Sequence, residues 1–229
     1  MAITGGKRVI GVLGGIGPEA SVEFYAKLVK KLQESGMIKR NEDFPKIIIN
    51  SIPAPELVGE KIRKKELKEY IKGIKELDLF NPDFIVMVCN TIHLYHPMLQ
   101  EKTRARILNL KEIVREKMLK ENLQPYLIIG TPSTVKQGLF EFEGIKSLKP
   151  TAKELSELAN AIKKFNRGFE KKKQVQKASS ICKKYLKAGA KTVLLGCTEF
   201  ALMLEKERFK KINTIDLLVE AAIHELQKR

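Results

Sequence analysis

The sequence predicts an α/β protein made of two similar halves, each with a mainly parallel sheet between layers of helices. Apolar runs rich in Val, Ile and Leu alternate with amphipathic helical patterns along the chain. Continuous apolar runs are typical of parallel strands that are buried on both faces. The order of elements also repeats, because KRVIGVLGGIGP corresponds to PYLIIGTPS and DFIVMVCNT corresponds to KTVLLGCTE. We therefore expect two three-layer α/β domains related by a pseudo-two-fold axis, with the equivalent edges of their sheets facing each other across a cleft.

The predicted strands are short apolar runs bounded by turn signals. In the first half these runs are KRVIGVLG, KIIINS and DFIVMVC, at residues 7–14, 46–51 and 83–89. In the second half they are PYLIIG, GIKSLK, KTVLLGC and INTID, at 125–130, 144–149, 191–197 and 212–216.

Helices are predicted between these strands, where apolar residues recur at helical spacing. Pro18 suits the first turn of the first helix, because its missing N–H would have no partner there. The predicted helical segments are 18–35, 56–79, 94–101, 110–121, 132–142, 151–187 and 217–228. The segment 151–187 is long, and Asn166-Arg167-Gly168 predicts a break within it.

The repeat also predicts the domain boundaries. We expect a first domain at 1–115 plus 205–229 and a second at 116–204, joined near the helix and loop of KEIVREKMLKENLQ. The final strand and helix, at 212–229, are expected to return to the first half. No low-complexity or Pro/Gly/Ser-rich linker interrupts the chain.

Composition narrows the class of protein. The 229 residues are 43% hydrophobic, which is ample for a buried core, and carry a formal net charge of +16. Lysines are interleaved with glutamates, as in EKIRKKELKEYIKGIKEL, which is typical of solvated helix surfaces and disfavours nucleic-acid binding. The N-terminal segment does not resemble a signal peptide, and no apolar run is long enough to span a membrane. Three cysteines, an odd number without clustered spacing, favour a reducing cytoplasm.

The turn after the first strand, Gly15-Ile16-Gly17-Pro18-Glu19-Ala20, matches the spacing of a dinucleotide-binding fingerprint. The second strand ends in Asn50-Ser51, however, without the acid that would hold a ribose. A tight strand-to-helix turn explains the glycines as well, and so does a backbone cradle for a carboxylate at the helix start. A dinucleotide-dependent oxidoreductase is therefore a runner-up interpretation.

Cys89, His93 and His96 have side chains that could bind a metal ion, but no further Cys or His pair completes a tetrahedral set. We expect no metal.

Cys89 and Cys197 stand at equivalent strand ends, where open α/β sheets bind their ligands. Each precedes an expected helix start, where backbone amides should lower the pKa of a thiol. Thr91 and Thr198 could cap these helices or bind a ligand. A buried cysteine with no chemical role is the alternative for each. Cys182 lacks such a context and is expected on a helix face.

Two thiols on opposite sides of a ligand could invert a carbon centre. One removes a proton from one face of the carbon and the other delivers a proton to the opposite face, which is general acid–base catalysis with two bases. Such a site also needs hydrogen-bond donors around the substrate carboxylate. The candidates are Asn90, Thr91, Thr198 and the backbone amides of Gly14 and Gly15, with Thr131, Ser133 and Thr134 as weaker ones.

The motifs GVLGGIGPEA, CNTIH (89–93), GTPST (130–134) and LLGCTEF (194–200) resemble the aspartate/glutamate racemase superfamily, most closely its aspartate racemase branch. The resemblance covers nearly the whole chain and rests mainly on the two cysteine motifs. It implies two α/β domains around a cleft, amino-acid racemisation without pyridoxal phosphate or metal, and a homodimer. It also implies that Cys89 and Cys197 are the acid/base pair and that Asn90, Thr91 and Thr198 contact the substrate. Ile92 and Glu199, which belong to the same motifs, complete the candidate substrate site.

The chain departs from the family pattern at two positions. Aspartate-type members carry an arginine and a lysine for substrate carboxylates, and these positions fall near Leu57 and Ser156 here. A shift of a few residues would instead bring in Lys61, Arg63 or Lys153. We therefore also expect that the substrate could be non-acidic, or that the chain could be a non-catalytic protein that binds carboxylates. The hydantoin and maleate branches of the superfamily are further alternatives.

Overall fold

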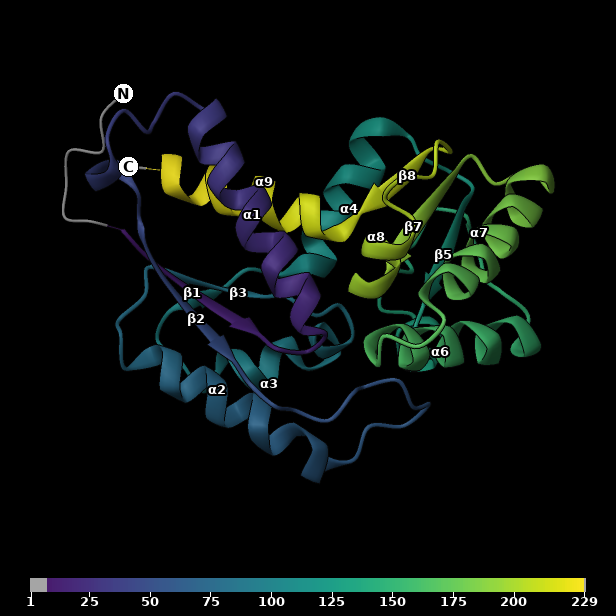
Figure 1. The fold of residues 1–229 in the computed structure, drawn as a ribbon, viewed down its shortest axis with the longest axis horizontal. Helices are drawn as coiled ribbons and strands as arrows, with labels where there is room; N and C mark the ends of the chain where they lie inside the picture. The colour runs from purple at the N-terminus through teal and green to yellow at the C-terminus, as the bar shows by residue number, and fades with distance from the viewer. Residues whose placement is uncertain (1–7, 229) are drawn as a thin grey trace.

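The computed structural model of the protein describes residues 8–228, which form two four-stranded parallel sheets. The first sheet has the order β2-β1-β3-β4, and the second has the order β6-β5-β7-β8. Their strands are β1 (Val9–Gly14), β2 (Lys46–Ser51), β3 (Phe84–Met87), β4 (Arg106–Ile107), β5 (Tyr126–Gly130), β6 (Ser147–Leu148), β7 (Thr192–Gly196) and β8 (Lys211–Asn213). The two orders correspond strand for strand, so the predicted repeat of an α/β unit is confirmed. Figure 1 shows the two units side by side.

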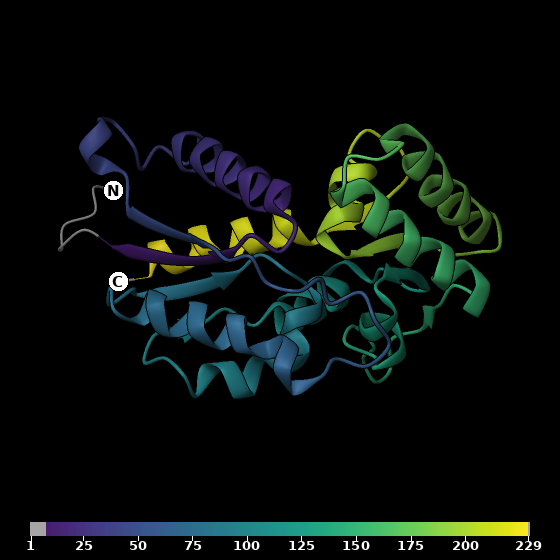
Figure 2. The ribbon, with the colours of Figure 1, turned by 60° about the horizontal axis from the view of Figure 1, so that its bottom comes forward.

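Helices cover both faces of the first sheet. Alternate residues of its strands point to opposite faces: Ile10 and Val12 join the core beneath α1 (Pro18–Glu34) and α9 (Thr214–Gln227), whereas Leu13 packs toward α2 (Lys68–Asp78). This arrangement explains why the strand sequence is apolar without alternation. Figure 1 shows α1 and α9 on one side of the sheet and α2 on the other, and Figure 2 shows the same separation of α1 from α2. The remaining helices of this half are α3 (His96–Gln100) and α4 (Leu110–Glu121).

The second sheet is surrounded by α5 (Pro132–Lys136), α6 (Ala152–Asn166), α7 (Lys171–Lys187) and α8 (Thr198–Met203). The predicted break in 151–187 is confirmed, because α6 ends at Asn166 and α7 begins at Lys171. Gly168 lies in this break with φ +72°, a conformation that glycine adopts at little cost. Cys182 is fully buried on α7, in agreement with its expected place on a helix face.

Several predicted elements are shorter than expected. The segment 56–79 becomes helical only at Lys64, as a short 3-10 turn before α2, because Gly59 disfavours helix and its carbonyl accepts instead from Ser133 of the second half. The segment 132–142 ends at Lys136, and Gly138 follows with φ +64°. The run 144–149 contributes only β6, and the two-residue strand β4 was not predicted. Lys7, the first residue of the predicted first strand, lies outside the described residues.

The end of the chain is divided between the halves. The strand predicted at 212–216 was assigned to the first half, and this is wrong: β8 pairs in parallel with β7, with Leu194 opposite Ile212. The pairing satisfies backbone groups of β7 on the side that β5 leaves free. Helix α9 then crosses back and packs against α1 and α4, so the expected return to the first half holds for the helix only.

The helix surfaces carry the mixed charges that the lysine–glutamate pattern predicts. Ion pairs one helical turn apart include Lys30–Glu34, Lys72–Glu76 and Lys117–Glu121. Exposed pairs of this kind contribute little to stability, because water and salt screen their charges. Within residues 8–228, no helix has the length and apolarity needed to cross a lipid bilayer.

Candidate active site

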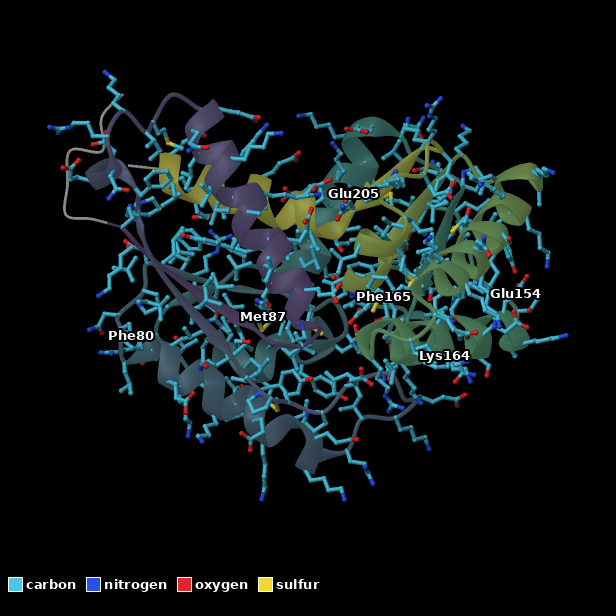
Figure 3. The ribbon with its side chains drawn as sticks, viewed as in Figure 1. Phe80, Met87, Glu154, Lys164, Phe165 and Glu205 are labelled. Carbon is cyan, nitrogen blue, oxygen red and sulfur yellow. The ribbon has the colours of Figure 1, made fainter. Side chains whose placement is uncertain are left out.

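The two motif cysteines lie at the corresponding ends of equivalent strands. Cys89 follows β3 by two residues and Cys197 follows β7 directly. Their side chains are 7% and 6% exposed. They are close enough that a negative charge on Cys89 raises the pKa of the Cys197 thiol. The structure therefore brings the two predicted residues together at the junction of the halves, through the strands that correspond in the repeat. In Figure 3, Met87 marks the end of β3 and Phe165 marks the last turn of α6, which also reaches this junction.

The prediction that helix starts lower the thiol pKa values is wrong for this structure. Burial raises the pKa of Cys89 to about 12 and outweighs the backbone amides of Ile92 and Thr91, which act in the opposite direction. Burial also raises the pKa of Cys197 well above its usual range. The segments that follow the cysteines are a five-residue 3-10 helix and the six-residue α8, and such short helices provide only a weak dipole.

Glu199 is the charged group in direct contact with a cysteine. The Cys197 thiol donates to Glu199 Oε2 over 2.7 Å, and the Glu199 side chain is buried, with 5% of its surface exposed. The Glu199 charge raises the pKa of both Cys197 and Cys89. Thr198 Oγ1 donates to the same carboxylate oxygen over 3.3 Å, and Asn166 Nδ2 donates to Oε1 over 3.0 Å. A carboxylate is thus fixed beside one thiol and acts on both.

The glycine turn after β1 makes room for this carboxylate. Gly17 has φ +68°, and a Cβ atom there would lie 2.6 Å from Glu199 Oε1. Any side chain at this position would therefore displace Glu199. The turn faces a carboxylate rather than an open phosphate cradle, which disfavours the dinucleotide interpretation. Pro18 occupies the first turn of α1, as predicted.

Gly14 and Gly15, which were predicted to offer amides to a substrate, are packed within the protein. A Cβ on Gly14 would lie 2.4 Å from Ser21 Oγ, and one on Gly15 would lie 2.5 Å from the Ile52 carbonyl oxygen. The Gly15 amide donates to Ser21 Oγ over 3.0 Å. In this structure the Gly15 amide is therefore committed to the turn itself.

Asn90 connects the two halves. Its amide donates to the Leu195 carbonyl over 3.1 Å and to Thr214 Oγ1 over 2.9 Å, so both amide hydrogens cross to the second half and the start of α9. Thr214 Oγ1 lies 3.1 Å from Asn90 Oδ1 and can donate back to it. Asn90 is 1% exposed. Its side chain positions the Cys89 segment against the strand that precedes Cys197.

The predicted hydroxyl donors also meet across the junction. Thr91 Oγ1 lies 3.0 Å from Thr131 Oγ1 and 3.1 Å from Thr134 Oγ1, which makes a buried triangle of three hydroxyls. Neither Thr91 nor Thr198 caps a helix through its side chain, whereas Thr131 caps α5 by accepting from the Thr134 amide. Ile92 is fully buried in the apolar cluster that also contains Cys89.

A loop from the first half covers this region. Residues 52–63 lie between β2 and the turn before α2, and the Tyr70 hydroxyl donates to the Pro55 carbonyl over 2.7 Å. Ser133, another predicted site residue, donates to the Gly59 carbonyl over 2.6 Å. Sequence reasoning missed this cover, and with it Glu56, Tyr70 and Asn166, because the contacts that place the loop join residues far apart in the chain.

The positions where the family pattern expects cations hold none. Leu57 is buried against the apolar cluster of α2, and Ser156 is exposed on α6. Of the neighbouring alternatives, Arg63 pairs with Glu66 over 3.1 Å, and Lys61 and Lys153 are exposed.

The histidines near Cys89 are engaged with the protein. The His93 and His96 rings stack with centroids 6.2 Å apart, and His93 contacts the Met87 carbonyl and the Leu110 amide. In the described part of the chain, no group of three or more His, Cys, Asp and Glu side chains is arranged to hold a metal ion.

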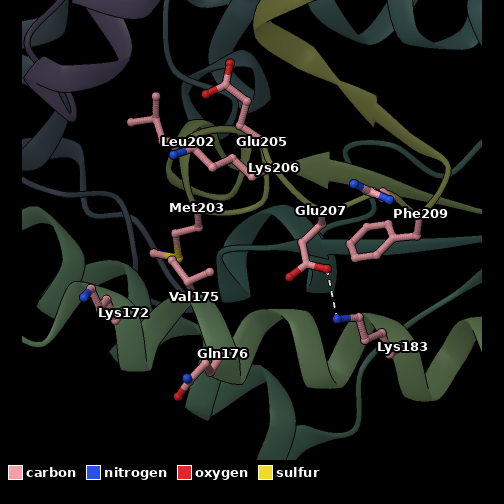
Figure 4. A pocket seen from close by; sticks show the side chains of 11 residues that line it. Lys172, Val175, Gln176, Lys183, Leu202, Met203, Glu205, Lys206, Glu207 and Phe209 are labelled. Atoms are coloured by element: carbon pink, nitrogen blue, oxygen red, sulfur yellow. Dashed lines mark ion pairs between the residues drawn. The ribbon is translucent and has the colours of Figure 1, made fainter.

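A cavity of about 800 Å³ lies elsewhere, between α7 and the segment that follows α8 (Figure 4). Its walls include Val175, Met203 and Phe209, with an ion pair between Lys183 and Glu207 over 2.9 Å. Neither Cys89 nor Cys197 lines it. The size of a cavity therefore does not locate the candidate site in this protein.

Comparison with known proteins supports the two-domain fold. An aspartate racemase homologue from Pyrococcus horikoshii superposes with a TM-score of 0.73 at 23% identity, covering 96% of this chain and 100% of that one. Picrophilus torridus aspartate racemase superposes with a TM-score of 0.76 at 20% identity, covering 97% and 95%. A glutamate racemase from Francisella tularensis gives a TM-score of 0.68 at 18% identity, covering 95% and 80%. At these identities the likeness shows the fold.

In sequence, the chain is 27% identical over 135 residues to the broad specificity amino-acid racemase RacX of Bacillus subtilis. This match spans 58% of the chain and 59% of RacX. The model of the Asp/Glu/hydantoin racemase family matches residues 13–224, which include both halves and both motif cysteines. The chain therefore belongs to the Asp/Glu/hydantoin racemase family.

Proposed function

We propose that this protein is an amino-acid racemase in which Cys89 and Cys197 exchange protons with the two faces of the substrate α-carbon. The observation that carries the proposal is the placement of both cysteines at the ends of corresponding strands, β3 and β7, where the two halves meet. Family membership and the likeness to proteins named as aspartate, glutamate and broad specificity racemases support the same reaction.

The proposed reaction needs one thiolate and one thiol. The thiolate takes the α-proton, so the Cα–H bond breaks, an S–H bond forms, and the electron pair stays on the α-carbon and its carboxylate. The opposite thiol then gives its proton to the other face, and a new Cα–H bond forms with inverted configuration. The roles of the two sulfurs are reversed afterwards. No redox step occurs, and the reaction requires no pyridoxal phosphate.

Glu199 supports this chemistry in the proposal. Burial and the Glu199 charge both favour the protonated form of Cys197. Because the Glu199 carboxylate accepts the hydrogen bond of the Cys197 thiol at 2.7 Å, Glu199 is proposed to hold and orient this thiol as the group that delivers a proton to the substrate. The hydroxyls of Thr91, Thr131 and Thr134 are buried next to the Cys89 segment and are proposed donors to the substrate carboxylate, with Thr198 on the other side.

The experiment is α-proton exchange in deuterated buffer, measured by mass spectrometry or NMR for both enantiomers of each common amino acid. The wild-type protein should incorporate deuterium and produce the opposite enantiomer of at least one of them. Cys89→Ala and Cys197→Ala should each lose racemisation by about 10²–10⁴-fold, the usual contribution of one general acid or base.

Cys182→Ala is the matched control, because Cys182 is also a buried cysteine but lies on α7. It should keep wild-type exchange. Full racemisation by either of the other two variants would overturn the two-cysteine mechanism. Ligand binding without exchange of any α-proton would favour a non-catalytic carboxylate-binding protein instead.

We further propose that the protein is a homodimer in the cytoplasm, as the family resemblance suggests. Sedimentation equilibrium of the purified protein measures the first point, and fractionation of cells measures the second.

A further inference from the structure

The cavity between α7 and the segment 204–210 has apolar walls. Val175 comes from α7, Leu202 and Met203 from the end of α8, and Phe209 from the segment itself. All four side chains pack in or against the main core cluster, and in Figure 4 the Met203 side chain points toward Val175. The volume of about 800 Å³ falls within the range of about 300–1,000 Å³ in which proteins bind small molecules.

The charged residues of the lining are unevenly paired. Both glutamates have a cation nearby: Lys183 Nζ lies 2.9 Å from Glu207 Oε2, and Lys27 Nζ lies 3.8 Å from Glu205 Oε1. The other charged side chains of the lining are three exposed cations, Lys172, Lys206 and Arg208. Within residues 8–228, none of these three forms an ion pair with an Asp or Glu. The cavity is therefore left with excess positive charge.

A buried hydroxyl lies on the same face of α7. Ser179 is one helical turn from Val175 and one from Lys183, which both line the cavity. It is 4% exposed, and in the described part of the chain its Oγ has no hydrogen-bond partner of good geometry. It lies close enough to the Glu207 carboxylate to lower the pKa of that group, after the larger effect of Lys183. Buried hydroxyls without a partner are uncommon, and this one leaves a polar atom at the cavity wall for a ligand.

We propose that this cavity binds a small molecule that carries an anionic head group, a carboxylate or a phosphate, on an apolar body. The apolar body would lie against Val175, Met203 and Phe209, and the head group would lie near Lys206 and Arg208. Lysine and arginine bind both kinds of anion, and their field is stronger beside low-dielectric walls than on an open surface.

Neither feature alone would indicate a ligand. The chain has a net charge of +16, so unpaired cations also occur elsewhere on its surface. Here they surround a hollow with apolar walls and a buried hydroxyl without a partner, and this combination matches a molecule with two unlike ends. Cys89 and Cys197 do not line the cavity, so the site is separate from the proposed racemase chemistry.

The test is isothermal titration calorimetry of the purified protein at near-neutral pH with five probes: octanoate, octyl phosphate, octylammonium, acetate and inorganic phosphate. Octanoate or octyl phosphate should bind at one site, with a Kd at least about 10-fold lower than that of octylammonium or of either small anion. The tighter of the two identifies the head group. Added salt should weaken the binding, because it screens the cations at the rim.

Substitutions then locate the site. Lys206→Gln and Arg208→Gln should each raise the Kd of the preferred probe about 2- to 5-fold, as expected for an exposed charge. Leu202→Gln should also raise it, because it removes apolar surface from the wall. The matched control is Lys177→Gln, the same change of charge at an exposed position of α7 that does not line the cavity; it should leave the Kd unchanged. Melting temperatures show that each variant is folded.

Three results would overturn the inference. The first is equal binding of octylammonium or acetate, which would mean that either the charge or the apolar body is irrelevant. The second is an effect of Lys177→Gln as large as that of Arg208→Gln, because general attraction to a basic protein would then explain the binding. The third is the absence of saturable binding by both octanoate and octyl phosphate.

Discussion

Lowering the pH from 8 to 5.5 should destabilise the folded protein by about 1.4 kcal/mol through His93 alone, and the local geometry explains why. The His93 side chain is 3% exposed. Its Nε2 lies 3.3 Å from the Met87 carbonyl, and its Nδ1 lies 3.4 Å from the Leu110 amide, which donates to it. A second ring proton would stand on Nδ1 and face the Leu110 N–H, so this environment suits only the neutral imidazole.

The magnitude follows from the pKa difference between the unfolded and folded states. Burial lowers the pKa of His93 from 6.5 to about 3, the Met87 carbonyl acts in the opposite direction, and His96 adds a further lowering. The unfolded chain therefore binds more protons between pH 6.5 and about pH 3. The stability that neutral His93 contributes is fully present above this pH range and is lost as the pH falls through it. One pH unit below the unfolded pKa corresponds to about 1.4 kcal/mol.

Urea denaturation at pH 8, 7, 6 and 5.5 measures this effect, and the melting temperature should fall by about 3–6 °C for a chain of this size. Carboxylates with a lowered pKa, such as Glu154 at about 2, lose their stabilising effect mostly at more acidic pH. In His93→Leu, the loss of unfolding free energy that His93 causes between pH 8 and pH 5.5 should be absent, whatever the stability of this variant at pH 8. The matched control, His224→Leu at an exposed position of α9, should retain it. An identical pH dependence in wild-type and His93→Leu protein would refute the reasoning.

Three further predictions concern the junction of the halves. Asn90→Ala should lower the free energy of unfolding by about 2–3 kcal/mol, because it removes two buried hydrogen bonds and leaves the Leu195 carbonyl and Thr214 Oγ1 without this donor. A loss under about 0.5 kcal/mol in urea denaturation would contradict the role of Asn90 in joining the halves. Glu199→Gln should speed alkylation of Cys197 by iodoacetamide at pH 8, because it removes a charge that raises the pKa of the Cys197 thiol. Peptide mass spectrometry measures the alkylation rate, with Cys182 as the internal reference. An unchanged or slower rate would count against the contact between Glu199 and Cys197. Tyr70→Phe removes the hydrogen bond to the Pro55 carbonyl and should lower the free energy of unfolding by about 1 kcal/mol. It should also make residues 52–63 more sensitive to limited proteolysis. Unchanged cleavage would show that other contacts hold the loop.

The sequence alone was sufficient for the class of fold and for the equivalence of the two motif cysteines. Strands buried on both faces must be apolar throughout, and both β1 and β7 have this pattern because helices cover each side of their sheets. A duplicated α/β unit places corresponding strand ends at corresponding points, so the equivalence of Cys89 and Cys197 was readable from the repeat. Local rules also located α4, whose bounds are as predicted, and the break between α6 and α7.

Edge pairing was decided only by the tertiary structure. A strand of three residues such as β8 can complete either sheet as far as its own sequence shows, and the free side of β7 determined the outcome. The same holds for the loop 52–63, whose place depends on contacts with Tyr70 and Ser133.

The electrostatics of the site were also beyond the sequence. The pKa of a thiol depends on the balance between burial and helix amides, and at Cys89 burial prevails. The shared amide of Asn166 joins Glu56 and Glu199 across 110 and 33 positions of the chain. Local pattern determines which faces are apolar and where a chain turns; the partners of a charge, and the water that remains near it, depend on which distant segments the fold brings together.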